Sequence, residues 1–168
     1  AGTVETCVFI GSVEAAGENA VRGGLVGKAE STDSVSDGYC YSAEDVKPVG
    51  DGAYTKCFYL AAKSTRGAAN DNGARTEQEF SIGRVAWELL GENEQFKNTA
   101  PKPHWAQENG MPAIESYVSL YYLYEVELVK RSGPEGLSVI MQANEANALL
   151  EGDTQRVYVA AANEITID

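Results

Sequence analysis

The stretch VSLYYLYEVELVKRSG, Val118 to Gly133, contains no Gly, Pro, Asn or Asp before its last residue. Read as a strand, it alternates between a face expected to lie on the core and a more polar face. The first face carries Val118, Leu120, Tyr122, Tyr124, Val126 and Leu128, and the second carries mainly Ser119, Tyr121, Glu125 and Glu127. At about 3.3 Å per residue, a strand ending near Lys130 would be roughly 40 Å long and would cross a whole sheet. A helix is the alternative, but it would spread the apolar residues around the cylinder.

Other segments show the same pattern of strand-forming residues. They are Val4 to Ile10, YTKCFYLAA at Tyr54 to Ala62, LSVIMQ at Leu137 to Gln142, QRVYVAA at Gln155 to Ala161 and EITID at Glu164 to Asp168. Glycines between the first two segments predict turns and bulges: Gly23, Gly24, Gly27, Gly38, Gly50 and Gly52. The sequence therefore predicts a protein built mostly from strands.

Four further segments are assigned from their local composition. We expect exposed loops at Lys63 to Arg75, which is polar and turn-rich, and at Ala100 to Pro112, which holds three of the five prolines. Thr76 to Leu90 alternates on either side of Gly83, which predicts two strand halves with a bulge, although its Glu and Leu residues also favour helix. Asn144 to Glu151 is expected to form one or two helical turns.

The length of 168 residues suits one domain, residues 1–168, with a single core. Together these features predict an antiparallel β-sandwich or jelly roll with long loops and little helix.

The charge balance narrows the range of partners. The chain carries 13 Lys plus Arg and 25 Asp plus Glu, a net charge of -12, which opposes direct binding to a nucleic-acid backbone. No apolar run is long enough to span a bilayer. The chain begins with Ala1 rather than Met, as expected of a processed or truncated chain.

The three cysteines are Cys7, Cys40 and Cys57. They have no CxxC spacing and no nearby His, so we expect no zinc site. One disulfide at most can form within a monomer, and the apolar surroundings of Cys7 and Cys57 favour free, buried thiols.

The segment DSVSDGYCYSAE, Asp33 to Glu44, matches part of the spacing of a calcium loop. Asp33, Asp37 and Glu44 would be the metal ligands, but the third position is Val35 and cannot supply an oxygen. We expect no cofactor and favour an acidic turn in which Val35 points into the core, with calcium as the alternative.

Aromatic and carboxylate residues supply two other hypotheses. Trp105, Tyr39 and Tyr41 could form a platform that stacks on sugar rings, although core packing is the more frequent role of such residues. The sole histidine, His104, has no recognisable nucleophile motif with it, which argues against a catalytic triad. The many carboxylates leave open an enzyme that hydrolyses glycosides with a carboxylate pair.

Two segments resemble strands of a known family. YYLYEVEL, Tyr121 to Leu128, is similar to the last shell strand of the jelly-roll coat proteins of small icosahedral RNA viruses, and CVFIGSV, Cys7 to Val13, is similar to the first. The resemblance implies a jelly-roll fold and a subunit that assembles with copies of itself in a virion. The basic RNA-binding arm of such proteins is absent from this sequence.

We therefore expect a non-catalytic structural or assembly protein, such as a virus coat or another extracellular assembly subunit, whose partner is itself. A secreted carbohydrate-binding β-sandwich is the alternative, and a hydrolase that uses carboxylates is the third hypothesis. The expected location is extracellular or in a virion, with the cytoplasm not excluded.

Overall fold

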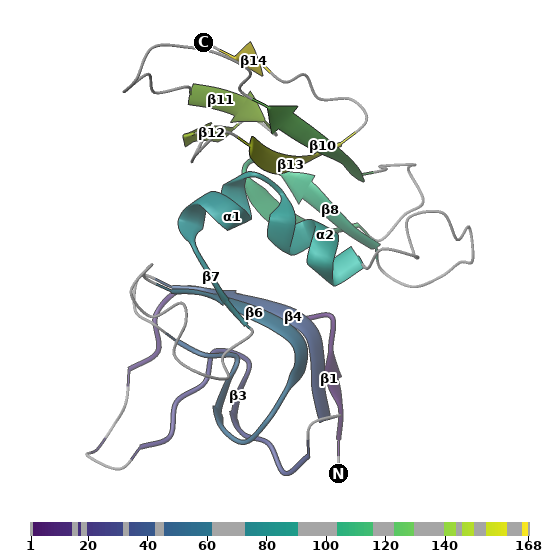
Figure 1. Cartoon of the computed structure of the whole chain (residues 1–168). Coiled ribbons are helices and arrows are strands. Elements are labelled where there is room, and N and C mark those ends of the chain that lie inside the picture. The colour runs from purple at the N-terminus through teal and green to yellow at the C-terminus, as the bar shows by residue number, and fades with distance from the viewer. Residues whose placement is uncertain are drawn as a thin grey trace. The chain divides into compact units, whose positions relative to one another are not determined.

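The computed structural model of the chain describes residues 2–14, 17, 20–31, 34–42, 46–61, 73–90, 104–115, 123–129, 140–143, 146–149, 154–160 and 166–167. The chain divides into two compact units, Ala1–Glu77 and Gln78–Asp168. Within the described residues there are fourteen strands and two short helices (Figure 1). The prediction of a mostly β protein with little helix is confirmed. None of the described helices is long and apolar enough to cross a bilayer.

The described residues of the first unit form seven strands. They are β1 (Val4–Glu5), β2 (Val8–Ile10), β3 (Val26–Lys28), β4 (Val35–Tyr41), β5 (Val49–Asp51), β6 (Thr55–Leu60) and β7 (Ala74–Arg75). In the main sheet β4 pairs with both β1 and β2, β6 pairs with β4, and β7 pairs with β6. Each of these pairings is parallel, as is the separate pairing of β3 with β5.

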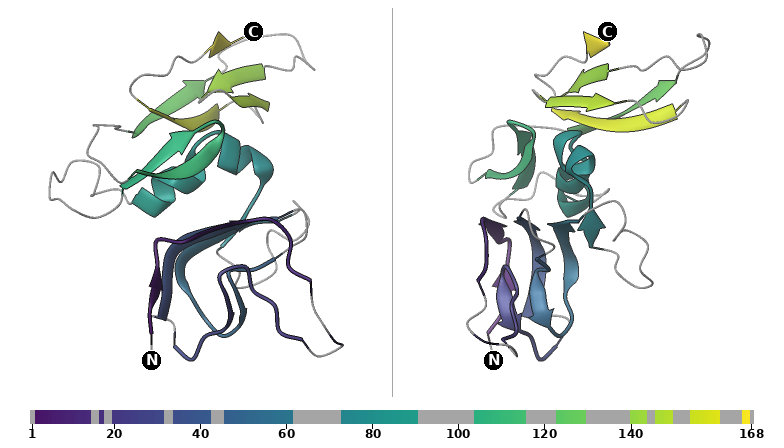
Figure 2. Two further views of the ribbon diagram at one scale, coloured as in Figure 1. Left: turned by 180° about the vertical axis from the view of Figure 1, so that it is seen from behind. Right: turned by 90° about the vertical axis from the view of Figure 1, so that its left-hand side faces the viewer.

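This topology is a stack of coils. The strand β3 belongs to the connection from β2 to β4, and β5 belongs to the connection from β4 to β6. Because the two connections pair with each other as well, the second pass of the chain lies on the first at two places, as in a parallel β-solenoid. The strand β6 of the third pass then continues the main sheet on β4. The strands of this unit run side by side in the right-hand view of Figure 2.

The prediction of an antiparallel sandwich or jelly roll is therefore wrong, and so is the fold implied by the viral resemblance. Residues that alternate in polarity show that a strand has two faces, but they do not encode the direction of the neighbouring strand. The glycine-containing connections, which we expected to form turns and bulges, return the chain to the start of the next parallel strand.

A bend recurs at the same level of the stack. Thr6, Asp37 and Lys56 all adopt left-handed backbone conformations, with φ of 53°, 53° and 51°. The register on either side of the bend places Thr6 beside Asp37 and Asp37 beside Lys56. The three left-handed residues therefore lie next to one another in successive coils, and each turns the chain at the same corner of the stack.

Glycine allows the coils to approach closely at two positions in particular. A Cβ atom at Gly38 would lie 2.6 Å from the carbonyl oxygen of Cys7 on the neighbouring coil, and one at Gly50 would clash with the carbonyl oxygen of Arg22. A side chain at either position would force the backbones apart. Gly38 lies in β4 and Gly50 in β5, so these two glycines are contact points between coils rather than parts of the turns and bulges that we expected.

The core of the first unit lies inside the coils. One cluster contains Cys40, Tyr59, Ala61 and Ala74, against which Phe9 and Leu25 pack. A second contains Val35, Val49 and Cys57, and Leu25 packs against this one too. Leu25 thus joins the two clusters.

The second unit is built differently. After the helices α1 (Glu77–Ser81) and α2 (Arg84–Leu90) come the strands β8 (His104–Glu108), β9 (Met111–Glu115), β10 (Leu123–Val129), β11 (Ile140–Ala143), β12 (Ala146–Leu149), β13 (Thr154–Ala160) and β14 (Thr166–Ile167). The pairings of β8 with β9, β10 with β13, and β11 with both β12 and β14 are all antiparallel. The helix α2 packs against β8 and β9.

The opening stretch forms β10 where it is described. Glu125 and Glu127 are exposed, whereas Val126 and Leu128 are half-buried, so the predicted alternation is confirmed over this part. Its flanks, 118–122 and 130–133, lie outside the described residues, as does 62–72, which covers most of the loop expected at Lys63 to Arg75.

Three local predictions are wrong. Thr76 to Leu90 forms helices α1 and α2 rather than two strand halves, and Gly83, with φ of 83°, separates the helices instead of making a bulge. Asn144 to Glu151 contains the strand β12. Ala100 to Pro112, expected to be a loop, contains β8 and the start of β9.

Candidate functional site at the edge of the parallel stack

The first coil presents an open strand edge. Among the described residues, β1 and β2 pair with β4 alone. The carbonyl oxygen of Cys7 accepts a hydrogen bond from the Tyr39 N–H at 3.1 Å, and the Gly11 N–H donates to the Tyr41 carbonyl oxygen at 3.2 Å. Backbone groups of successive strand residues point in opposite directions. Those of Val8 and Ile10 consequently point away from β4, toward the open edge.

The side chains of this edge are apolar and exposed. Val8 is 37% exposed and Ile10 is 63% exposed, whereas Phe9 between them packs on the core cluster around Cys40 and Tyr59. No charged residue occurs between Glu5 and Glu14. We refer to the backbone and side chains of Val8 and Ile10 as the β2 edge. It lacks the Lys or Pro residues with which many proteins keep an exposed strand from pairing with another chain.

The cysteines behind the edge are free thiols. Cys7 and Cys57 share one row of the sheet with Gly38 between them, which separates their Cα atoms by about 10 Å. Cys40 is paired with Tyr59, two residues from Cys57, so the Cα atoms of Cys40 and Cys57 are about 8 Å apart. A disulfide requires less than about 7 Å. The register therefore keeps all three thiols unbridged.

Burial controls the ionisation of the two inner thiols. It raises the pKa of Cys40 to about 12 and that of Cys57 to about 11, and the neighbouring Cys57 adds to the increase at Cys40. Thiols with such pKa values are protonated near neutral pH and are poor nucleophiles. Cys40 and Cys57 therefore serve as small apolar core residues.

Of the three predicted calcium ligands, Asp37 alone lies in the described part of the chain. Asp37 lies in β4, and its Oδ1 atom is 3.0 Å from Nζ of Lys56. Asp33 and Glu44 lie outside the described residues. Val35, at the third position of the predicted loop, is 1% exposed and belongs to the core. Within the described part of the chain, no group of three or more His, Cys, Asp or Glu is arranged to hold a metal ion.

The predicted sugar platform is mostly buried. Tyr39 is 1% exposed and Trp105 is 4% exposed, so neither offers an open ring face. Tyr41 is half-buried, and its pKa is raised by burial and by Glu77, to which its hydroxyl donates a hydrogen bond. Tyr39 and Tyr41 share β4, whereas Trp105 belongs to the second unit. His104 lies in β8, where its backbone pairs with that of Glu115.

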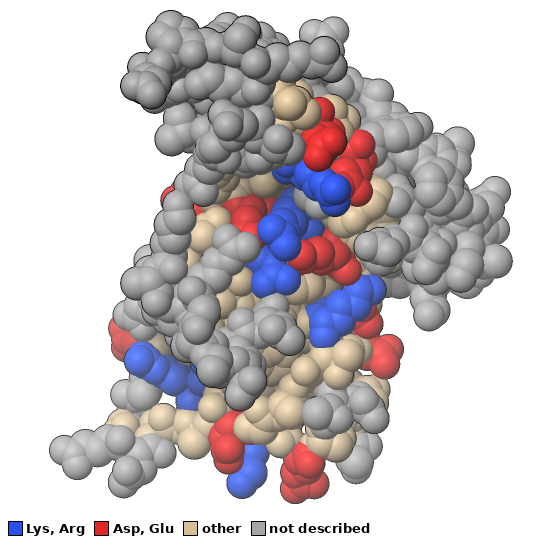
Figure 3. All heavy atoms as spheres, viewed as in Figure 1, with Lys and Arg blue, Asp and Glu red and all other residues tan. Residues whose placement is uncertain are grey.

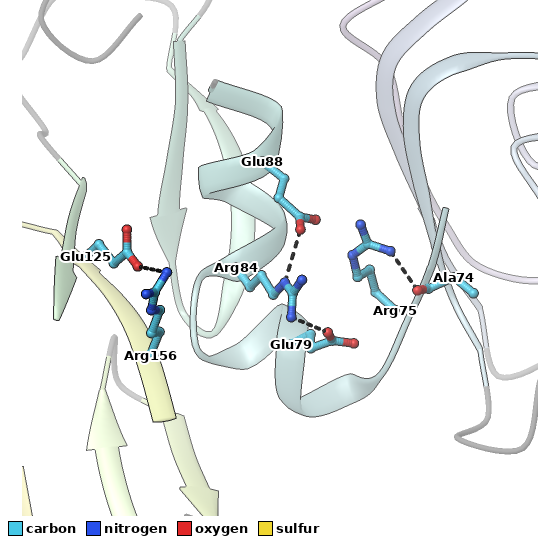
Figure 4. Close-up of polar contacts among 7 residues, drawn as sticks. All are labelled: Ala74, Arg75, Glu79, Arg84, Glu88, Glu125 and Arg156. Atoms are coloured by element: carbon cyan, nitrogen blue, oxygen red, sulfur yellow. Dashed lines mark hydrogen bonds and ion pairs between the residues drawn. The ribbon is translucent and has the colours of Figure 1, made fainter. Parts of the chain in front are cut away.

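A cluster of charges joins the two helices of the second unit. Nη1 of Arg84 is 3.0 Å from Oε1 of the buried Glu79, and Nε of Arg84 is 3.0 Å from Oε1 of Glu88 (Figure 4). Gln107 on β8 donates from Nε2 to the carbonyl oxygens of Phe80, at 2.8 Å, and Ser81, at 3.3 Å. These contacts tie α1 to α2 and β8.

A second group of ion pairs lies on the strands β10 and β13. Nη1 of Arg156 on β13 is 2.8 Å from Oε1 of Glu125 on β10, and Glu127 lies at 4.0 Å from Nε of Arg156. On the face drawn in Figure 3, basic and acidic side chains are interspersed. Because these arginines face carboxylates, we interpret the clusters as structural rather than as sites for an anion.

Sequence reasoning did not identify the β2 edge or the Arg84 cluster. The uncharged run between Glu5 and Glu14 was a signal for the first, but only the parallel pairing shows that β2 lies at an edge. The spacing of Arg84 and Glu88 was a signal for the second, since residues four apart meet on a helix. Comparison with models of known protein families, with curated proteins and with solved structures found no match.

Proposed function

We propose that this chain is a non-catalytic structural protein that associates with other chains through the β2 edge, as a subunit of a coat or another extracellular assembly. The observation that supports the proposal is the exposure of Val8 and Ile10 on a strand whose outward backbone groups meet no other strand among the described residues. A strand added to such an edge gains main-chain hydrogen bonds, and its apolar side chains bury exposed surface.

The negative charge of the chain works against association. Two copies that each carry a net charge of -12 repel one another at low ionic strength. Salt screens this repulsion over distances beyond about 10 Å at 0.1 M, while the apolar contact at the β2 edge is retained. Association is therefore expected to strengthen as salt is added.

The test measures molar mass by light scattering over a range of protein concentrations. The unaltered chain is expected to increase in mass with concentration, and Ile10→Lys is expected to stay monomeric because a charge replaces the most exposed aliphatic side chain of the edge. Val21→Lys is the matched control, since Val21 is 52% exposed in the same unit but lies outside the strands. It should associate like the unaltered chain.

Two results would contradict the proposal. One is a monomer at every concentration and salt condition. The other is equal association of the Ile10→Lys and unaltered chains, with circular dichroism showing that both are folded.

A further inference from the structure

We infer that Arg75 caps the β7 edge of the first unit and prevents a strand of another chain from pairing there. The β7 edge is the side of β7 that faces away from β6, at the opposite end of the main sheet from β1 and β2. Because this end is distinct from the β2 edge, the role of Arg75 does not depend on the function proposed for that edge. Arg75 limits where the chain can associate.

Backbone hydrogen bonds show which groups of β7 point outward. The Tyr59 N–H donates to the carbonyl oxygen of Gly73 at 2.9 Å, and the Ala61 N–H donates to that of Arg75 at 2.9 Å. The carbonyl groups of Gly73 and Arg75 therefore point toward β6, and that of Ala74, between them, points away. An added strand would have to donate a hydrogen bond to the Ala74 carbonyl oxygen in order to extend the sheet.

The guanidinium group of Arg75 already makes this hydrogen bond. Its Nη1 atom donates to the Ala74 carbonyl oxygen at 2.8 Å (Figure 4). Hydrogen bonds from a charged donor are roughly twice as strong as neutral ones. A backbone N–H from another chain would have to displace this cation, so it competes poorly for the Ala74 carbonyl oxygen.

A neighbouring ring holds the guanidinium group in place. The register pairs Arg75 with Leu60, so Arg75 projects from the same face of the sheet as Leu60 and Phe58. Cζ of Arg75 lies 4.6 Å from the centroid of the Phe58 ring. Since Phe58 is 6% exposed, the cation–π attraction between them is partly shielded from water. The Arg75 side chain is therefore held by two contacts, one to the ring and one to the outward carbonyl oxygen.

The two ends of the main sheet differ in how they are protected. The strand β2 carries the exposed Val8 and Ile10 and no charged residue, whereas Ala74 of β7 is 1% exposed and is followed by a cation. Charged side chains on edge strands are a common means of preventing edge-to-edge pairing. Without them, copies that pair edge to edge in an arrangement that does not close grow into filaments. Arg75 is placed to oppose such growth.

Substitution of Arg75 tests the cap by light scattering. Arg75→Met keeps an unbranched side chain but removes the charge and the donors. It should associate at a protein concentration at least about tenfold lower than the unaltered chain, with a mass that continues to increase. Arg22→Met removes the same charge from the same unit, outside the strands, and should behave like the unaltered chain. Arg75→Lys keeps a cation at the edge and should also behave like the unaltered chain.

The outcomes separate the role of Arg75 from the proposed function. A folded Arg75→Met chain that associates no more than Arg22→Met would overturn the cap, whether or not the unaltered chain associates. A monomeric unaltered chain together with an associating Arg75→Met chain would support the cap and overturn the proposed function. Circular dichroism establishes that each variant is folded.

A measurement on the unaltered chain covers the case in which Arg75→Met does not fold. The guanidinium protons of Arg75 should exchange with water at least about tenfold more slowly in the folded chain than in the urea-unfolded chain, because their hydrogen bond must open first. NMR spectroscopy measures both rates. Equal exchange in the two states would overturn the cap.

Discussion

Asp37 and Lys56 lie side by side on neighbouring strands, both with left-handed backbones, and Oδ1 of Asp37 is 3.0 Å from Nζ of Lys56. A left-handed conformation costs a non-glycine residue about 1–2 kcal/mol. Both side chains are more than a third exposed, so their ion pair contributes at most about 1 kcal/mol. The ion pair alone does not offset the cost of two such residues. We therefore infer that the stacking of successive coils stabilises the left-handed bend. The main role of Asp37 is to form this bend, and its ion pair with Lys56 is secondary.

Substitutions at Asp37 should separate the contribution of its backbone conformation to stability from that of its charge. Asp37→Asn keeps a residue that tolerates the left-handed conformation, so the free energy of unfolding should change by less than about 0.5 kcal/mol. Asp37→Val introduces a β-branched residue and should lower it by about 1–2 kcal/mol. Urea unfolding measures both. Equal losses for the two variants would mean that the ion pair, and not the bend, is the stabilising element.

Close contact between coils predicts that Gly50 is intolerant of a side chain. Gly50→Ala should lower the free energy of unfolding by about 1–3 kcal/mol, because the added Cβ meets the Arg22 carbonyl oxygen. Gly27→Ala, in the partner strand β3, is the matched control, since its nearest contact would be the Val21 carbonyl oxygen at an ordinary 3.6 Å. If the two variants unfold at the same urea concentration, the backbone at Gly50 does not lie close to the Arg22 carbonyl oxygen in the folded chain.

The buried thiols predict a loss of stability in alkali. The thiol pKa of 9.0 rises to about 12 at Cys40 and about 11 at Cys57 in the folded chain. Above about pH 9 the unfolded thiols lose protons that the folded state retains, so the free energy of unfolding should fall as the pH rises toward 11 and 12. Below about pH 9 these groups should add no pH dependence.

The control for alkaline unfolding removes both thiols. The double variant Cys40→Ala, Cys57→Ala should show a shallower fall in stability with pH than the unaltered chain, even if its stability at neutral pH is lower. Part of the fall should remain because burial also raises the pKa of Tyr39 to about 12. An unchanged slope would show that the two thiols are not buried in the folded chain.

The Arg84 cluster predicts unequal effects of removing its members. Arg84→Met leaves the buried carboxylate of Glu79 without its guanidinium and should lower the free energy of unfolding by about 1–3 kcal/mol. Glu88→Gln removes the more exposed carboxylate of the cluster and should cost less than about 1 kcal/mol. Thermal or urea unfolding of the two variants provides the comparison. A larger loss for Glu88→Gln would reverse the assigned roles of the two carboxylates.

The strands of the fold were more predictable than their pairing. Alternation identified β2, β6, β10 and β13, because the two faces of a strand meet different surroundings whatever the direction of the neighbour. Parallel pairing depends on where the connections lead, and no local pattern in this chain specifies that. The recurring bend was hidden for the same reason, since Thr6, Asp37 and Lys56 share a conformation but no residue type.

Two errors had signals that local reasoning could have used. Asn109-Gly110, with φ of 49° and 74°, makes the turn between β8 and β9, and this dipeptide is a strong hairpin signal that the prolines of Ala100 to Pro112 led us to overlook. The buried residues Val85, Ala86, Leu89 and Leu90 follow a helical spacing of three and four. The segment also alternates in part with the two-residue period of a strand, and this led to the incorrect strand prediction.

The predicted site residues depended on tertiary context. Asp37, Tyr39 and Tyr41 are consecutive alternate residues of β4, yet Asp37 pairs with a lysine, Tyr39 is buried and Tyr41 is half-buried. Sequence spacing cannot distinguish these surroundings. The β2 edge likewise could be identified only from the strand pairing, which shows that β2 pairs with β4 on one side.

The most direct test of the open edge is backbone amide exchange at Val8, Phe9 and Ile10, measured by NMR at several protein concentrations. In dilute solution the amides of Val8 and Ile10 should exchange rapidly, while that of Phe9, directed toward β4, is protected. As the concentration rises, protection should appear at Val8 and Ile10 in parallel with the increase in mass. Protection of both amides already in the dilute monomer, or rapid exchange of both in the associated protein, would contradict the account.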